Sequence, residues 1–136
     1  MTTLKVKDTE YKIKFGYNSF CDTDLLDRTS DIMGILQNKE TVKDMEFTRK
    51  MFTVTRELLF VGFKKFNPVE SIEAVGDLLD DYFDEGTKED THGLVDVFGI
   101  VAQELLAEGF FGDILTKSEK VIKTLTERAK KNQKKA

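Results

Sequence analysis

Two short segments near the start of the chain alternate apolar and polar residues with a period of two. The first is Leu4-Lys5-Val6, and the second is Tyr11-Lys12-Ile13-Lys14-Phe15. Such alternation is typical of strands with one buried face, and the polar stretch Lys7 to Glu10 is typical of a turn. The pattern therefore predicts a β-hairpin that ends at Gly16. Because an isolated hairpin is marginal in water, we expect it to pack on an apolar surface or to pair with a second copy.

After Gly16 the apolar spacing changes to three and four residues, which is the period of a helix. The sequence predicts a short helix that is capped by Asn18 or Ser19 and runs to Asp27. A further turn or two is expected at Asp31 to Leu36. The residues expected to face inward from the short helix are Phe20, Leu25 and Leu26.

A long helix is expected to open at Thr41. Its second half, from Leu58, is apolar nearly all round, so we expect that half to be buried on several sides. Asn67-Pro68 then marks a boundary, because Asn favours the N-cap and Pro the first position of the next helix. The expected inward stripe of the long helix consists of Val42, Met45, Phe52, Leu59, Phe63 and Phe66.

The helix after Asn67-Pro68 has one apolar and one acidic face, and Gly86 is its expected stop. The apolar positions are Val69, Ile72, Val75, Leu79 and Phe83, and the acidic ones are Asp77, Asp80, Asp81, Asp84 and Glu85. The next helix is expected to start at Asp90 or Thr91 and to close at Gly109. Its expected inward residues are Leu94, Phe98, Val101, Ala102 and Leu105.

Beyond Gly109 the chain becomes less apolar. Phe110-Phe111-Gly112 predicts a turn that carries two large rings. Thr116-Lys117-Ser118-Glu119 has the form of a capping box and opens a helix with few apolar residues. The elements together predict a mainly α fold: a short N-terminal β-hairpin, about four or five helices and a basic C-terminal tail. We expect one helical domain over residues 1–116 and a partly helical or disordered tail over residues 117–136.

The composition fits one soluble domain. With 136 residues, 40% of them hydrophobic and 34% charged, the chain can bury one modest core. The longest apolar runs, Leu58 to Phe63 and Val97 to Ala102, are far shorter than the about 20 residues that span a bilayer. We therefore expect no membrane segment. The start of the chain has no apolar stretch typical of a secretory signal. The single cysteine, Cys21, is compatible with a reducing cytoplasm.

The charge is divided between two parts of the chain. Residues 117–136 carry a net +6, which leaves −10 for the rest because the whole chain carries −4. The tail lysines, including Lys120 and Lys123, could solubilise the protein, dock on an acidic protein or contact nucleic acid phosphates. Nucleic acid is the least favoured partner, because the chain is acidic overall and no base-stacking aromatic lies among those lysines.

No group of residues predicts catalysis. The only histidine, His92, has no cysteine or second histidine near it in sequence, and we expect it at the surface or beside a helix cap. Cys21 is expected to be a buried or half-buried apolar group. The acidic stretch Asp77 to Glu85 lacks the ligand spacing of a calcium loop and is expected to be a solvated helix face. The sequence therefore predicts no enzymatic activity, no cofactor and no metal.

Aromatic residues favour a binding role. Phe accounts for eleven of the aromatics and has no polar group, so it serves packing in a core or in an interface. We expect a homo-oligomer. The glycines expected inside helices predict close helix-to-helix approach, and they are Gly62, Gly76 and Gly99. The residues expected to contact partners are Phe63, Phe66, Phe110, Phe111, Lys120 and Lys123.

The order of these features resembles the tail assembly chaperones of long-tailed, siphovirus-type bacteriophages. Members of that family open with a short hairpin that ends in a Phe-Gly step, here Phe15-Gly16 after Glu10 to Lys14. Their later helices resemble Arg56 to Phe63, Ile72 to Tyr82 and Leu94 to Leu105. The similarity spans roughly residues 4 to 115 and lies in arrangement more than in one motif. The lysine-rich end departs from many members of the family.

The resemblance implies a non-enzymatic protein of the infected host bacterial cytoplasm that is absent from the mature virion. Such a protein binds and solubilises the tape measure protein and helps to recruit tail tube subunits. In many phages a ribosomal frameshift adds a longer product, and Gln133-Lys134-Lys135 could be encoded by a slippery run of adenines. The alternative is a small helical regulatory or adaptor domain that contacts nucleic acid through the basic tail.

Overall fold

The chain begins with an antiparallel hairpin of β1 (Thr2–Val6) and β2 (Thr9–Ile13). The computed structural model describes residues 2–37 and 45–107. The turn between the strands contains only Lys7 and Asp8, whose φ angles are 47° and 67°. Positive φ at both central residues is the property of a type I′ turn, whose twist matches that of the strands. The predicted hairpin is confirmed, and its turn is shorter than the polar stretch suggested.

The helical region after the hairpin is arranged differently from the prediction. A 3₁₀ turn, η1 (Tyr17–Phe20), is followed by one continuous helix, α1 (Leu25–Gln37). Asp22 has a φ of 60°, which interrupts any helix between them. The hydroxyl of Thr23 accepts a hydrogen bond of 3.2 Å from the first N–H of α1. The prediction of a helix from Asn18 to Asp27 with a separate later turn was therefore wrong.

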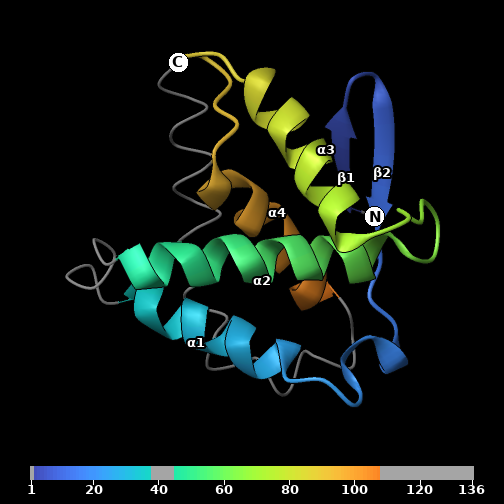
Figure 1. Cartoon of the computed structure of the whole chain (residues 1–136), viewed down its shortest axis with the longest axis vertical. Coiled ribbons are helices and arrows are strands. Elements are labelled where there is room, and N and C mark those ends of the chain that lie inside the picture. The colour runs from blue at the N-terminus through green and yellow to red at the C-terminus, as the bar shows by residue number, and fades with distance from the viewer. Residues whose placement is uncertain (1, 38–44, 108–136) are drawn as a thin grey trace.

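The central element is α2 (Met45–Phe63), which contacts α1, α3, α4 and β2. In Figure 1 it runs across the middle of the molecule, with α1 below it and α3 and the hairpin above it. The expected burial on several sides is confirmed for its second half. The predicted inward stripe is wrong at Met45, Phe52 and Phe66, which are 73%, 50% and 41% exposed. The predicted start at Thr41 and the stripe residue Val42 lie outside the described residues. The buried residues are Phe47, Met51, Val54, Thr55, Leu58, Leu59, Gly62 and Phe63.

The next helix, α3 (Ile72–Asp84), is capped by Ser71, whose hydroxyl accepts a hydrogen bond of 3.1 Å from the N–H of Ala74. The predicted cap, Asn67, lies before this helix and instead accepts a hydrogen bond of 2.9 Å from the N–H of Lys12. The helix stops at the predicted place, because Glu85 is its C-cap and the chain leaves it at Gly86.

The last described helix, α4 (Leu94–Ala107), begins three to four residues later than expected. Its predicted inward residues Phe98, Val101, Ala102 and Leu105 are buried, whereas Leu94 is only half-buried. The predicted end at Gly109 lies outside the described residues. No helix in the described ranges is both long enough and apolar enough to cross a bilayer. The described chain is mainly α, as the sequence predicts.

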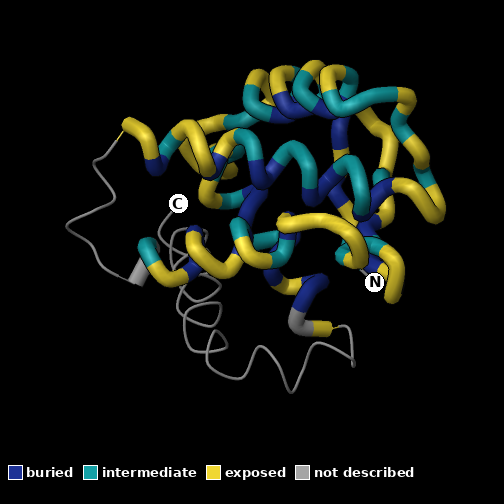
Figure 2. Tube along the Cα trace, turned by 60° about the horizontal axis from the view of Figure 1, so that its bottom comes forward, coloured by how far each residue is buried: buried dark blue, intermediate teal, exposed yellow. Residues whose placement is uncertain are grey.

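The hairpin is bound to the helices at both ends. Its inward residues Leu4, Val6 and Ile13 are buried in the common core. The Thr2 hydroxyl donates a hydrogen bond of 2.8 Å to Glu104 of α4, and the N–H of Lys7 donates one of 2.6 Å to Glu85. Figure 2 shows that the buried positions lie on the inner sides of the elements and the exposed ones on their outer turns.

The helical glycines serve different purposes from the one predicted. A Cβ at Gly62 would meet Ile13 of the hairpin, so the close approach there is to β2 and not to a helix. At Gly76 the nearest atom would be Cδ of Arg56, 3.7 Å away, which is an ordinary contact. At Gly99 nothing among the described atoms lies within 4 Å. The prediction of close helix-to-helix approach at these three positions was wrong.

Candidate protein-binding groove

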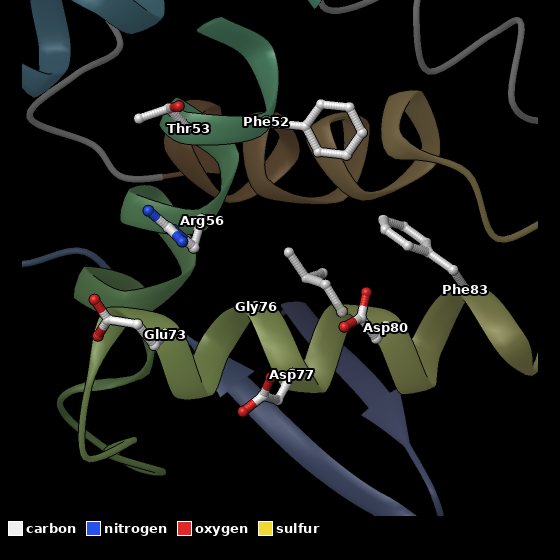
Figure 3. Close-up of a pocket in the computed structure, with 9 residues that line it drawn as sticks. Phe52, Thr53, Arg56, Glu73, Gly76, Asp77, Asp80 and Phe83 are labelled. Atoms are coloured by element: carbon white, nitrogen blue, oxygen red, sulfur yellow. The ribbon is translucent and has the colours of Figure 1, made fainter. Parts of the chain in front are cut away.

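A groove of about 430 Å³ lies between α2 and α3. Figure 3 shows its walls, with α2 on one side and α3 on the other. We call it the α2–α3 groove. Its lining residues are Phe52, Thr53 and Arg56 from α2 and Glu73, Gly76, Asp77, Leu79, Asp80 and Phe83 from α3.

The apolar part of the groove is made by two phenylalanine rings and a leucine. Phe52 is 50% exposed, Phe83 is half-buried, and Leu79 lies in the core below them. In Figure 3 the two rings project from opposite helices into the same space. Exposed rings of this size, surrounded by polar groups, are the usual anchors of protein interfaces. The groove can therefore receive an apolar side chain between Phe52 and Phe83.

The polar part of the groove is mostly acidic. Glu73, Asp77 and Asp80 make no ion pair or hydrogen bond through their side chains with any described residue. Arg56 is the one basic residue in the lining, and its Nε is buried without a hydrogen-bond partner in the described part of the chain. Three carboxylates and one guanidinium give the groove a net negative charge. A partner surface with basic residues would complement it.

The spacing of residues on α3 explains why the groove is both open and acidic. Glu73, Asp77 and Asp80 are four and three residues apart, so they lie on one face of the helix. Gly76 lies between them and adds no side chain, which leaves room opposite Arg56. All three acids are exposed, as expected for a solvated face. The same face also forms one wall of the groove, which the sequence analysis did not foresee.

The residues predicted to contact partners are separated in the structure. Phe63 is fully buried, and its ring lies 5.3 Å from that of Tyr11, so it belongs to the core and not to the surface. Phe66 lies beyond the end of α2 and is 41% exposed, with the ammonium groups of Lys12 and Lys65 5.5 and 5.6 Å from its ring centre. It does not line the groove. The other four, Phe110, Phe111, Lys120 and Lys123, lie outside the described residues.

Cys21 differs from expectation, whereas His92 lies beside the start of α4, which is one of its two expected places. The His92 ring stacks on Tyr82 with centroids 4.0 Å apart, and its Nδ1 lies 2.7 Å from the Tyr82 carbonyl oxygen. Because a carbonyl oxygen accepts, Nδ1 carries the proton in this contact. His92 does lie just before α4, but it is half-buried and not at the surface. Cys21, expected to be at least half-buried, is exposed.

Tyr82 is held in its neutral form by this environment. Burial, reinforced by the negative charges of Asp96, Asp90 and Glu85, raises the pKa of Tyr82 to about 12. A tyrosine that remains protonated and stacked on a histidine ring stabilises the junction between α3 and α4.

Within residues 2–37 and 45–107, no group of three or more His, Cys, Asp or Glu side chains is placed to hold a metal ion. Comparisons of the chain with models of protein families, with curated proteins and with solved structures found no match. The α2–α3 groove is therefore the surface on which a functional proposal can be built.

Proposed function

We propose that the chain is a tail assembly chaperone of a long-tailed, siphovirus-type phage. In this role it binds and solubilises the tape measure protein and helps to recruit tail tube subunits, without enzymatic activity. The observation that carries the proposal is the α2–α3 groove, in which Phe52 and Phe83 lie among carboxylates that have no partner in the described part of the chain. The order of the hairpin and the later helices, which resembles that family, supports the same role.

The groove suits the binding of a helix. An amphipathic helix binds by laying its apolar face into a groove, with anchor residues three, four or seven positions apart. Phe52 and Phe83 would take the apolar anchor, and Asp77 and Asp80 would face basic residues beside it. The resemblance implies a long, helical and aggregation-prone partner, and such a partner exposes apolar helix faces until the tail tube covers them.

The proposal also fixes where and when the protein acts. A chaperone that is displaced as the tail tube forms would work in the host bacterial cytoplasm and would not remain in the mature virion. The acidic surface of α3 supports this role, because charge on the outside of a complex keeps it in solution.

The test is co-expression with the tape measure protein encoded by the same phage. We expect the wild-type chain to keep the tape measure protein soluble and to purify with it. Phe52→Ser should reduce both, because it removes the exposed ring from the groove while changing the free energy of unfolding by no more than about 0.5 kcal/mol. The matched control is Val95→Ser on α4, which replaces a side chain of similar exposure, 51%, outside the groove.

The possible results test the chaperone function and the role of the groove separately. A tape measure protein that stays insoluble beside the wild-type chain would refute the chaperone function. Co-purification that survives Phe52→Ser as well as it survives Val95→Ser would retain the function but remove the groove from it. Thermal midpoints of both variants confirm that any loss of binding is not a loss of folding.

A further inference from the structure

The outer edge of β1 carries backbone groups that point away from the hairpin. Val6 and Thr9 close the two-residue turn, so they form a hydrogen-bonded pair. Hydrogen-bonded and non-hydrogen-bonded pairs alternate along an antiparallel ladder. Leu4 therefore also bonds to β2, whereas the N–H and C=O groups of Thr3 and Lys5 point outward.

The two edges of the hairpin differ in their hydrogen bonds to the rest of the protein. On the β2 side, the N–H of Lys12 donates to Asn67 and the N–H of Lys14 donates to the Gly62 carbonyl, both at 2.9 Å. On the β1 side, Thr3 and Lys5 make no hydrogen bond to any described residue beyond the hairpin. Among the described residues, one edge is covered and the other is open.

The open edge borders a groove of about 410 Å³. On one side lie Thr3, Leu4, Lys5, Lys7 and Asp8, and on the other lie Tyr82, Glu85, Asp90, His92 and Ile100. The groove provides space beside β1, where an added strand would lie about 4.8 Å from it. Unpaired edge groups beside open space are a template for another strand.

We propose that the outer edge of β1 pairs with the same edge of a second copy of this chain. Two identical edges related by a two-fold axis must run antiparallel, so the two hairpins would join into one four-stranded sheet. This inference does not depend on the α2–α3 groove or on the identity of its partner.

The outward groups select the register of this pairing. With the two-fold axis through Leu4, Thr3 faces Lys5 of the second copy and Lys5 faces its Thr3. All outward N–H and C=O groups of these residues are then bonded. An axis through Lys5 would place two like charges directly opposite each other, which is unfavourable. An axis through Thr3 would leave the Lys5 groups without these partners.

The charges beside the edge allow a second copy to approach. The groove is lined by Lys5, Lys7 and Asp8 on its β1 side, which is net positive, and by Glu85 and Asp90 on its opposite side. A second copy of β1 therefore brings lysines toward a wall that contains carboxylates. A groove of one sign would instead repel its own copy.

The first experiment compares two proline substitutions on opposite edges of the same strand pair. Lys5 and Glu10 face each other across the hairpin, and neither uses its N–H in the ladder. Sedimentation of the full chain should show a dimer of twice 15.6 kDa at high concentration. Lys5→Pro should weaken the dimer by about tenfold or more, because it removes an N–H from each half of the interface. Glu10→Pro should leave the dimer unchanged.

The second experiment tests the register in a Cys21→Ser background, which removes the native exposed thiol. A mixture of Thr3→Cys and Lys5→Cys chains should form disulfide-linked dimers under mild oxidation. The Cα atoms of a hydrogen-bonded pair lie about 5.5 Å apart, within the range of a disulfide. Each variant alone should cross-link far less, because equal positions are not opposite each other in this register.

A chain that remains a monomer, or a dimer weakened equally by Lys5→Pro and Glu10→Pro, would overturn the proposal. Preferential cross-linking of Thr3→Cys with itself would overturn the register. Circular dichroism of each variant shows whether the helical fold is retained. If Lys5→Pro unfolds the chain, amide hydrogen exchange of the wild type tests the pairing instead. The N–H groups of Thr3 and Lys5 should become protected from exchange as the protein concentration rises, whereas that of Glu10 should not. Phe52→Ser should leave the dimer intact, so a failure of the chaperone proposal cannot be mistaken for a failure of this one.

Discussion

The backbone carbonyl of Gly62 accepts a hydrogen bond of 2.9 Å from the N–H of Lys14, immediately after the end of β2. At the same place, a Cβ on Gly62 would lie 3.0 Å from Cγ2 of Ile13 and 3.3 Å from the ring of Phe15. Both neighbours are fully buried, so neither can move aside without disturbing the core. The helix and the hairpin are therefore joined backbone to backbone, and a residue without a side chain is required there.

The first prediction follows from this contact. Gly62→Ala should destabilise the fold by about 1–3 kcal/mol, because the added methyl group overpacks the site. Gly99→Ala on α4 is the matched control, since nothing described lies within 4 Å of its Cβ. That substitution should stabilise the helix by up to about 1 kcal/mol. Urea unfolding of both variants measures the difference, and equal effects would contradict the close contact.

The second prediction concerns the turn of the hairpin. Lys7 and Asp8 both adopt positive φ, which is unfavourable for Lys, is better tolerated by Asp and Asn, and costs glycine least. Replacing the pair by Asn-Gly should stabilise the fold by about 0.5–1 kcal/mol, even though the exposed Lys7–Asp81 ion pair is lost. A rise in the thermal midpoint would confirm the turn type. A fall would show that the lost ion pair outweighs the relief of backbone strain.

The third prediction concerns the junction of α3 and α4. His92→Ala should cost about 1–2 kcal/mol, because it removes the ring stacked on Tyr82 and the hydrogen bond to the Tyr82 carbonyl oxygen. Asp90→Asn keeps the imidazole in place and alters only the exposed carboxylate beside its Nε2. It should change the free energy of unfolding by no more than about 0.5 kcal/mol. Chemical unfolding that ranks the two variants in the opposite order would argue against the stack.

The fourth prediction concerns alkaline pH. The pKa of Tyr82 is raised from 10.0 to about 12 in the folded chain, chiefly by burial. Between these values the unfolded chain releases a proton that the folded chain keeps, so stability falls as pH rises above about 10. Below that range the contribution is fully present. Tyrosinate absorbance should show a late step near pH 12 that disappears in Tyr82→Phe, and the same variant should have a flatter decline of stability with pH.

The sequence predicted the elements best where one face of each is buried. The alternation at Leu4 to Val6 and the spacing of Val75 and Leu79 depend only on which side faces the core. The hairpin and most of the buried face of α4 were predicted for this reason, whereas the stop of α3 was predicted from the preference of glycine for the end of a helix. Asp22 interrupts the first helical region because its φ is positive. Aspartate can adopt this conformation, but its presence in the sequence does not predict it.

The groove could not be predicted from the sequence. Helical periodicity shows which face of a helix is apolar, but it does not show how much of that face is packed against neighbouring elements. Phe52 and Leu59 are seven residues apart and therefore lie on nearly the same side of α2. Leu59 is covered by the other elements, whereas Phe52 lies beside the opening between α2 and α3. Phe66 follows the same spacing, but the helix ends at Phe63. Only the positions of the neighbouring elements distinguish an exposed ring from a core ring.

The hydrogen bond between Thr2 and Glu104 has a consequence for the order of folding during synthesis. The first strand leaves the ribosome early, but its partners on α4 are made about a hundred residues later. Until then β1 lacks its contacts with α4, and the hairpin, α1, α2 and α3 can associate only around an incomplete core. A pause in translation before Leu94 should therefore leave nascent chains sensitive to proteases and dependent on host holdases. Release of α4 should close the structure in one cooperative step.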